Sequence, residues 1–199
     1  MNKSLVLNLL IIILEIVGLM TVYVLYHQLG IVFYTVLSNI LLLISSSLLV
    51  GFITHKKKIP EWLSILKYTS TICATITFLV VILVLAPMYG FNYKHMLFEH
   101  ELLYLHFLCP VLSIITFVFY DKIDIDRVFM GAIATLTYIA VLLPLNLLRI
   151  VDGPYPFLRV YNQSIFMSFV WFIVMVGGSY LTGLLLKKLH DKFNCNVKE

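Results

Sequence analysis

The sequence predicts an all-α fold, namely a polytopic membrane protein built as a bundle of six transmembrane helices with a re-entrant or capping loop before the last. Composition is the first reason, because 61% of the 199 residues are hydrophobic and only 12% are charged, whereas soluble domains carry about 25% charged residues. The second reason is that six apolar runs are each long enough to cross about 30 Å of hydrocarbon. Residues 1–199 are therefore expected to form a single transmembrane domain.

The six expected spans follow one another with short polar breaks. They cover residues 5–26, 32–54, 63–88, 100–120, 128–149 and 164–186, as judged from apolar length and from the charged and turn-forming residues between the runs. The first run follows Met1, Asn2 and Lys3 and so resembles a signal sequence. It is too long for such a segment and shows no small-residue cleavage site, so we assign it as the first span.

The basic residues predict the orientation of the chain. Eleven of the fourteen Lys and Arg residues fall on one side of the predicted spans, Lys67 counted among them, and only Lys94, Arg149 and Arg159 fall on the other. Because short cytoplasmic loops carry the excess of Lys and Arg, both termini are expected on the cytoplasmic side of the plasma membrane. The net charge of +4 then reflects lysines near the span ends and does not indicate nucleic-acid binding.

Unusual polar residues gather toward the predicted outer side, whereas the cytoplasmic half shows lysines and little else. The outer set comprises His27, Thr35, Ser38, Asn39, His95, Glu99, His100, His106, Asn146, Arg149, Asp152, Tyr155, Arg159 and Asn162. A functional site, if the chain has one, is therefore expected to open outward.

Three polar residues of span 2 share one helix face. Thr35, Ser38 and Asn39 stand at positions i, i+3 and i+4, which lie on one side of a helix. Such a face turns toward the bundle interior because lipid offers no hydrogen-bond partners, and Glu15 of span 1 is expected to face inward as well. Small and hydroxylated residues are also common where membrane helices simply pack. The pattern leaves both interpretations of Thr35 and Asn39 open.

His106 is the least expected residue of span 4, because ionisable residues inside spans are rare and are candidates for function. Glu99 and His100 begin the span and fit the headgroup level. A neutral imidazole accepts a proton from a hydroxyl, so a Thr or Ser across the bundle is a candidate nucleophile with His106 as its base. A purely structural hydrogen bond is the alternative. Cys109 shares this face as a candidate nucleophile or an apolar filler, and Pro110 is expected to kink the helix.

The histidines and Glu99 raise the alternative of a metal site. Zinc requires three or four ligands that converge tetrahedrally. His95, Glu99 and His100 do not have a suitable spacing, because Glu99 and His100 are neighbours and point apart on a helix. We therefore expect no metal and no other cofactor.

The stretch before the last span is stiff and apolar. Two prolines flank Tyr155 and force an extended backbone, while Phe157 and Leu158 make the stretch apolar enough to enter the bilayer. Irregular backbone at membrane depth is tolerated only where protein or water covers it. A re-entrant cap over an outer cavity and an interfacial aromatic anchor both remain consistent with the pattern.

Three motifs together resemble a known family. Phe33-Tyr34-Thr35 with Ser38-Asn39, Leu105-His106 followed by Pro110, and Tyr155-Pro156-Phe157-Leu158 resemble the bacterial six-span relatives of the androgen-induced, FAR-type membrane hydrolases. Animal members of that family cleave fatty acid esters of hydroxy fatty acids with a membrane-embedded Thr and His. The resemblance implies that Thr35 is the nucleophile and His106 its base. The chain departs from the family at Arg159, where an acidic residue usually stands.

The function expected from the residues and the resemblance is an intramembrane lipid-ester hydrolase with an outward-facing cavity. Its partner would be a lipid or acyl-ester substrate drawn from the membrane. Supporting or substrate-binding roles are expected for Ser38, Asn39, Glu99, His100, Cys109, Asn146, Tyr155 and Arg159. A related acyltransferase, and a non-catalytic protein that binds or transports a small solute or lipid, are the alternatives.

Overall fold

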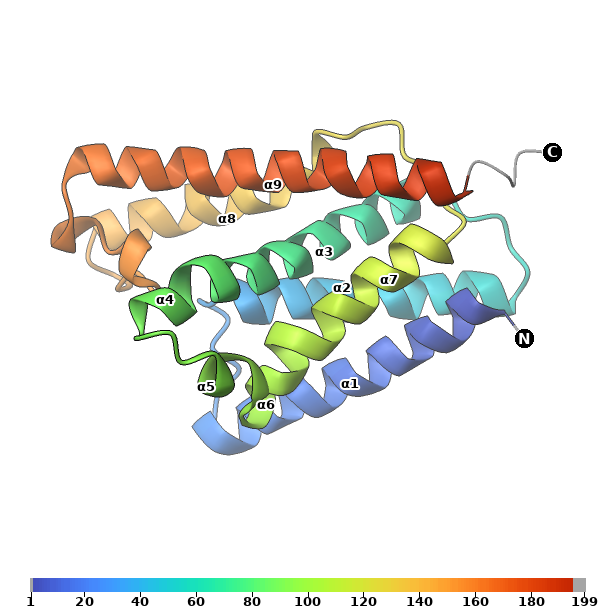
Figure 1. Cartoon of the computed structure of the whole chain (residues 1–199), viewed down its shortest axis with the longest axis horizontal. Coiled ribbons are helices and arrows are strands. Elements are labelled where there is room, and N and C mark those ends of the chain that lie inside the picture. The colour runs from blue at the N-terminus through green and yellow to red at the C-terminus, as the bar shows by residue number, and fades with distance from the viewer. Residues whose placement is uncertain (1, 195–199) are drawn as a thin grey trace.

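The computed structural model describes residues 2–194, and this part of the chain is helical without any strand. Six long helices run up and down in chain order (Figure 1): α1 (Lys3–Tyr26), α2 (Tyr34–Thr54), a third helix Glu61–Met88, a fourth helix His100–Phe119, α8 (Met130–Leu147) and α9 (Ile165–Asn194). All six are long and apolar enough to cross a membrane. The predicted all-α bundle of six spans is confirmed, while position 1 and positions 195–199 of the predicted domain lie outside the described residues.

The third and fourth helices each contain a π-helical segment. The third consists of α3 (Glu61–Val80), η1 (Val81–Leu85) and α4 (Ala86–Met88), and the fourth of α6 (His100–Leu102), η2 (Leu103–Leu108) and α7 (Cys109–Phe119). Both π segments end two residues before a proline, Pro87 or Pro110. A proline has no N–H to donate, and its ring crowds the preceding turn. The wider π turn gives the ring room, so the backbone responds to Pro110 with a π segment ahead of it.

The last helix is longer than the sequence predicted, ending at Asn194 rather than near residue 186. Its final two turns are amphipathic: Lys187 pairs with Asp191 on the exposed side, and His190 is buried with its ring centroid 4.9 Å from that of Phe117. Hydropathy alone ends the span at the first lysines. The pair Lys187–Asp191 and the packing of His190 on Phe117 stabilise the helix beyond the apolar run.

The third helix occupies the centre of the bundle. Its α3 portion packs against α2, α7, α8 and α9, and 56% of its most apolar stretch is buried, compared with 22% for α9. The buried side chains of α3 are mostly small or hydroxylated and include Ser70, Thr71, Cys73, Ala74, Thr75 and Thr77. Small residues let helix backbones approach closely in lipid, where no hydrophobic effect drives them together.

Glycines mark the closest helix approaches. A Cβ atom on Gly131 of α8 would lie 2.2 Å from the Cδ1 atom of Ile72, and one on Gly183 of α9 would lie 2.7 Å from the hydroxyl of Tyr68. A Cβ atom on Gly18 of α1 would lie 2.8 Å from the Cδ2 atom of Leu105. Gly18 therefore lets α1 lie directly against the π segment η2.

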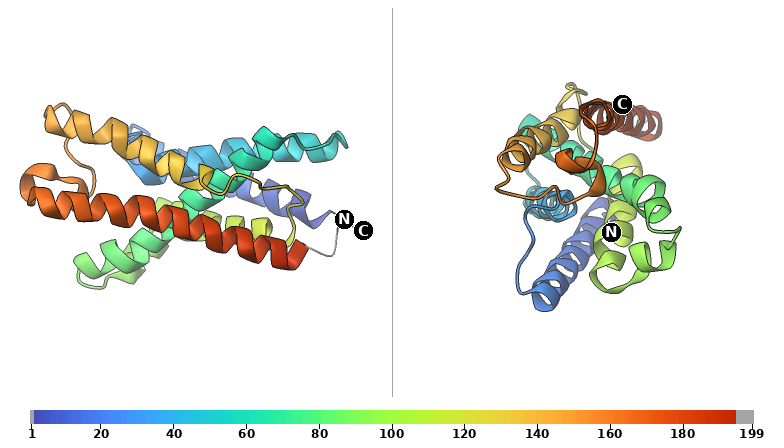
Figure 2. Two further views of the ribbon diagram at one scale, coloured as in Figure 1. Left: turned by 90° about the horizontal axis from the view of Figure 1, so that it is seen from above. Right: turned by 90° about the vertical axis from the view of Figure 1, so that its left-hand side faces the viewer.

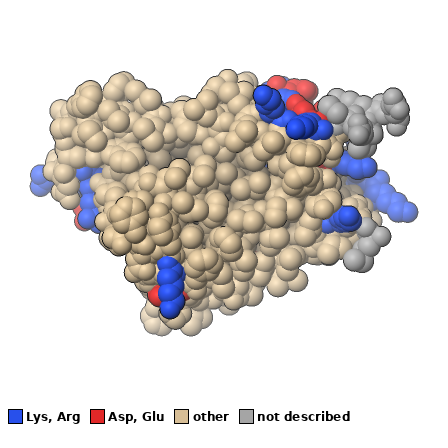
Figure 3. All heavy atoms as spheres, in the orientation of Figure 1, with Lys and Arg blue, Asp and Glu red and all other residues tan. Residues whose placement is uncertain are grey.

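The start of α1 and the end of α9 lie at one end of the bundle, which we call the terminal end; the opposite end is the site end (Figures 1 and 2). Figure 3 shows charged side chains near the two ends of the visible face, separated by a band without charged atoms. Many large apolar side chains are exposed along the helices, among them Ile13, Leu83, Val141 and Leu181. This surface suits a multi-pass membrane protein, whose lipid-facing side chains need no burial in protein.

Short helical elements cover the site end. They are α5 (Tyr93–Phe98) between the third and fourth helices, and the 3-10 turns η3 (Pro156–Leu158) and η4 (Val160–Asn162) before α9. Phe157 of η3 is only 2% exposed, and its ring centroid lies 5.0 Å from that of Trp171 in α9. The loop 148–164 therefore caps this end of the bundle. Whether it enters the membrane stays a prediction.

Candidate functional site

Thr35 is the second residue of α2, at the site end. The helix begins after Phe33, whose backbone is extended, and the side chains of Ser38 and Asn39 donate to the carbonyl oxygen of Thr35 at 2.9 and 2.7 Å. The first N–H groups of a helix have no acceptor within the helix. The N–H of Thr35 is therefore available to a side chain from elsewhere in the fold.

Asn39 also supports the π segment that carries His106. The hydrogen bonds of a π turn reach back five residues, so the carbonyl oxygen of Leu105 would be paired with the N–H that Pro110 does not possess. The side-chain amide of Asn39 donates to this carbonyl at 3.2 Å. One side chain thus bonds both to the backbone of Thr35 and to the residue before His106, which fixes the two helices relative to each other.

The side chains of Thr35 and His106 meet across the bundle. The Oγ1 atom of Thr35 lies 3.4 Å from the Nε2 atom of His106, and the Nδ1 atom of His106 lies 2.8 Å from the carbonyl oxygen of Met96 in α5. A carbonyl oxygen only accepts hydrogen bonds. The Nδ1 atom must therefore carry the proton in the neutral ring, which leaves the lone pair of Nε2 directed at the hydroxyl of Thr35.

Tyr155 completes this group from the capping loop. Its hydroxyl lies 3.2 Å from the backbone nitrogen of Thr35 and 3.3 Å from the Oγ1 atom. Its ring stacks on Phe157, with centroids 5.3 Å apart, and meets Phe33 edge to face. Burial raises the pKa of the Tyr155 phenol above its ordinary value, because an apolar setting disfavours the phenolate. Tyr155 therefore keeps its proton and acts as a hydrogen-bond donor.

These contacts admit one consistent order of protons. The N–H of Thr35 donates to the Tyr155 oxygen, and the Tyr155 hydroxyl donates to the Oγ1 atom of Thr35. The Thr35 hydroxyl donates to the Nε2 atom of His106, whose Nδ1–H donates to the carbonyl oxygen of Met96. The two contacts of the Thr35 hydroxyl are long for hydrogen bonds. Looser geometry of this kind is usual in catalytic groups without a substrate. A hydroxyl nucleophile and its general base require contacts in this order.

A small cavity borders Thr35 and Tyr155. Its volume is about 20 Å³, roughly the space that one water molecule needs. Thr77, Tyr34 and Tyr138 contribute the other polar side chains of the lining, and the remainder is apolar. The cavity therefore has room for one water molecule beside Thr35.

Five of the sequence-predicted residues are thus brought together: Thr35, Ser38, Asn39, His106 and Tyr155. Ser38 connects the group to α3, since its hydroxyl lies 2.9 Å from that of Thr77. Glu99 instead pairs with His95 on the surface, and His100 is exposed. Cys109 is fully buried and packs with Ile11, Leu42 and Ala74, away from the Thr35 hydroxyl.

Asn146 and Arg159 hold the capping loop rather than entering the site. The amide nitrogen of Asn146 donates to Val151 at 3.0 Å, and its amide oxygen accepts from the N–H of Val160 at 3.2 Å. The Nε atom of Arg159 donates to the carbonyl oxygen of Gly153 at 3.2 Å. These bonds fold the loop so that Tyr155 points at Thr35, which gives both residues an indirect role in the geometry.

The considered metal ligands do not converge within residues 2–194. No group of three His, Cys, Asp or Glu side chains in this range has the geometry to hold a metal ion. Both ring nitrogens of His106 face protein atoms, the hydroxyl of Thr35 and the carbonyl oxygen of Met96.

Comparisons of the chain with models of protein families, with curated proteins and with solved structures found no match. The family resemblance therefore remains a hypothesis that rests on the motifs around Thr35, His106 and Tyr155.

The terminal half of the bundle holds a second polar group that the sequence analysis missed. Lys67 is fully buried, and its Nζ atom donates to the Oδ1 atom of Asn8 and to the hydroxyl of Ser46, each at 2.8 Å. The amide nitrogen of Asn8 donates in turn to the carboxylate of Asp121 at 2.9 Å, which also accepts from Ser4. The expectation that this half contains lysines and little else is wrong.

Lys67 was also misassigned when the basic residues were counted, because it lies inside the bundle and not at its surface. Without it the remaining basic residues still divide ten to three. Glu15, near the middle of α1, is fully buried, as expected, and the thiol of Cys109 lies against its carboxyl group.

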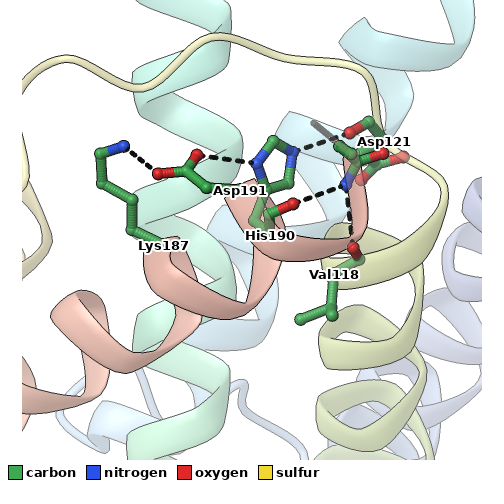
Figure 4. Close-up of polar contacts among 6 residues, drawn as sticks. Val118, Asp121, Lys187, His190 and Asp191 are labelled. Atoms are coloured by element: carbon green, nitrogen blue, oxygen red, sulfur yellow. Dashed lines mark hydrogen bonds and ion pairs between the residues drawn. The ribbon is translucent and has the colours of Figure 1, made fainter. Parts of the chain in front are cut away.

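Asp121 joins this network to the end of α9 (Figure 4). The Nε2 atom of His190 donates to the carbonyl oxygen of Asp121 at 2.9 Å, and the Nδ1 atom of His190 lies 3.7 Å from the carboxylate of Asp191. Asp191 is paired with Lys187 at the surface. The carboxylate of Asp121 therefore binds α1, while its backbone binds α9. Because Asp121 closely follows α7, it links α1, α7 and α9 at the terminal end.

Proposed function

We propose that this protein is an intramembrane hydrolase of lipid esters, with Thr35 as nucleophile and His106 as general base. The esters are those in which a fatty acid is bound to the hydroxyl group of a hydroxy fatty acid. The observation that carries the proposal is the ordered set of contacts Tyr155–Thr35–His106–Met96. The proposal requires no metal or cofactor.

The first half of the reaction forms an acyl-enzyme. The Oγ1 atom of Thr35 attacks the carbonyl carbon of the ester while the Nε2 atom of His106 takes the hydroxyl proton. The imidazolium formed is stabilised because its Nδ1–H already donates to the carbonyl oxygen of Met96. Collapse of the tetrahedral intermediate breaks the bond to the alcohol oxygen, and His106 returns the proton to that oxygen.

Two donors beside Thr35 are suited to the negative charge of the intermediate. The Tyr155 hydroxyl and the N–H of Thr35 both lie next to the attacking oxygen, and the first turn of a helix favours negative charge. Preorganised donors aimed at a developing oxyanion supply a large part of the rate in acyl transfer. Tyr155 serves in this role because burial keeps its phenol protonated.

The second half of the reaction releases the acid. A water molecule attacks the acyl group on Thr35, His106 takes a proton from that water, and Thr35 recovers a proton as the carboxylic acid leaves. The cavity of about 20 Å³ beside Thr35 has the size for such a water. An acyltransferase would share the first half and replace the water by another alcohol.

The ten-to-three division of basic residues supports an orientation in which the terminal end is cytoplasmic and the site end faces outward. In this orientation the substrate comes from the outer leaflet of the plasma membrane. The resemblance to bacterial relatives of the FAR-type hydrolases supports the same assignment of Thr35 and His106.

A fluorophosphonate probe tests the proposal directly, since it reacts with activated hydroxyl nucleophiles. The purified protein should be labelled, and Thr35→Ala should abolish the labelling. Thr21→Ala is the matched control, because Thr21 is only half-buried and its hydroxyl donates to the carbonyl oxygen of Val17 in its own helix. Labelling that is absent in the native chain, or that survives in Thr35→Ala, would contradict the hydrolase and favour a binding or structural role for the polar group.

A further inference from the structure

A groove on the side of the bundle runs between α2 and α8 and ends beside the proposed site. Its volume is about 540 Å³, within the range of small-molecule sites. The α2 wall is formed by one helix face with Leu37 and Leu41, and the α8 wall by one face with Thr137, Val141 and Leu145. Nearly all of the lining is apolar.

The groove opens toward the surface that the spans present to lipid. Leu37 is 39% and Val141 58% exposed, and Thr137 is exposed as well. From Ala134 to Leu145 the wall extends about 16 Å along α8, at 1.5 Å of rise per residue. One leaflet contributes roughly half of the ~30 Å hydrocarbon core. The groove thus has the length and polarity of a single acyl chain lying along the membrane normal.

The groove and the cavity at Thr35 share one wall. Tyr34 and Tyr138 line both, and their rings meet edge to face with centroids 5.1 Å apart. The Tyr34 hydroxyl lies 2.8 Å from that of Thr135, and the Tyr138 hydroxyl donates to the carbonyl oxygen of Val32 at 2.8 Å. Tyr34 immediately precedes Thr35, so one end of the groove lies next to the nucleophile.

We infer that this groove binds the long acyl chain of the substrate, which enters sideways from the membrane between α2 and α8. The carboxyl end of the chain lies at Tyr34 and Tyr138, the residues that the groove shares with the cavity at Thr35. This inference rests on the proposed hydrolase. The occupant is a long acyl chain, because the lining offers it apolar contact along its length and no charged side chain.

A chain-length comparison tests the inference by activity. In Thr137→Phe the new ring occupies the groove, so the ratio of kcat/KM for a palmitoyl ester to that for a butyryl ester should fall about tenfold or more, since single methylene-sized changes in apolar pockets reach that size. Ala140→Phe places the same ring on another, exposed face of α8 and should leave the ratio as in the native chain. A ratio that is equal in both variants would overturn the inference.

Photo-cross-linking tests the location without depending on activity. A palmitate probe with a diazirine near its methyl end, in phosphatidylcholine vesicles holding the native chain, should form adducts mainly on the groove positions Leu37, Leu41, Val141 and Leu145. Adducts spread equally over exposed positions of α1 and α9, or missing from the groove because a second copy of the chain covers it, would overturn the inference. Groove adducts in a protein without any ester turnover would support the groove while contradicting the hydrolase, so the two failures are distinguishable.

Discussion

The side-chain amide of Asn39 donates to the carbonyl oxygen of Leu105, 3.2 Å away, which is the carbonyl that a π turn leaves unpaired because Pro110 lacks an N–H. Asn39→Leu should therefore destabilise the protein by about 1–3 kcal/mol, the usual cost of a buried acceptor without a donor. It should also slow fluorophosphonate labelling, because His106 follows Leu105 directly.

Pro110→Ala supplies the missing N–H, which gives this prediction its control. In the double variant with Asn39→Leu the backbone can pair the Leu105 carbonyl itself. The loss of stability should then be smaller than the sum of the two single losses, as measured by thermal unfolding in detergent. Strict additivity would show that the amide of Asn39 does not compensate for the proline.

Thr35 and His106 should behave as one catalytic unit. His106→Ala and Thr35→Ala should each remove nearly all hydrolysis, and the double variant should lose little more, because members of such a unit are strongly non-additive. His95→Ala serves as the control, since His95 pairs with Glu99 at the surface. Substantial hydrolysis by His106→Ala, or failure of that variant alone to accumulate in the membrane, would favour a structural histidine.

Tyr155→Phe should lower kcat by roughly 10²–10³, the range seen when one oxyanion donor is removed. Folding should persist, because the ring keeps its stack on Phe157. A loss confined to KM would instead assign Tyr155 to substrate binding.

The raised pKa of Tyr155 has its own consequence for stability. The folded chain holds this proton to a higher pH than the unfolded chain, in which tyrosine titrates near pH 10. The contribution of the phenol to stability is therefore complete below about pH 10 and is lost as the pH rises above it. The native protein should lose thermal stability more steeply than Tyr155→Phe as the pH rises above about 10.

Residue patterns within short stretches of the sequence predicted the spans and part of the site. They could not predict contacts between segments that are far apart in the chain. Thr35, Ser38 and Asn39 were recognised because they share a helix face. The carbonyl oxygen of Met96 was not, since a backbone acceptor has no residue signature and depends on α5 folding back over η2. Lys67 was counted with the cytoplasmic lysines because hydropathy cannot show that Asn8 and Ser46 pair with it from two other helices.

The orientation of the chain is open to a labelling experiment. Single cysteines replacing Lys57 and Lys94, both exposed and at opposite ends of the bundle, should react with a membrane-impermeant maleimide from opposite sides. The ten-to-three division of basic residues predicts that intact cells label the Lys94 position alone. If the Lys94 position reacts only after permeabilisation, the site faces the cytoplasm.

The buried network at the terminal end should be sensitive to the loss of either ionisable partner. Lys67→Met removes the amine that Asn8 links to the carboxylate of Asp121, and Asp121→Asn removes that carboxylate. Removing one member of a buried ion pair typically costs about 3–5 kcal/mol, whereas replacing both members is often close to neutral. Lys67→Met combined with Asp121→Asn should therefore be more stable than either single variant, as measured by unfolding in detergent. Lys122→Met is the matched control, because Lys122 is exposed one residue from Asp121, and it should unfold like the native chain. A double variant as unstable as the sum of the single losses would show that Lys67 and Asp121 act independently.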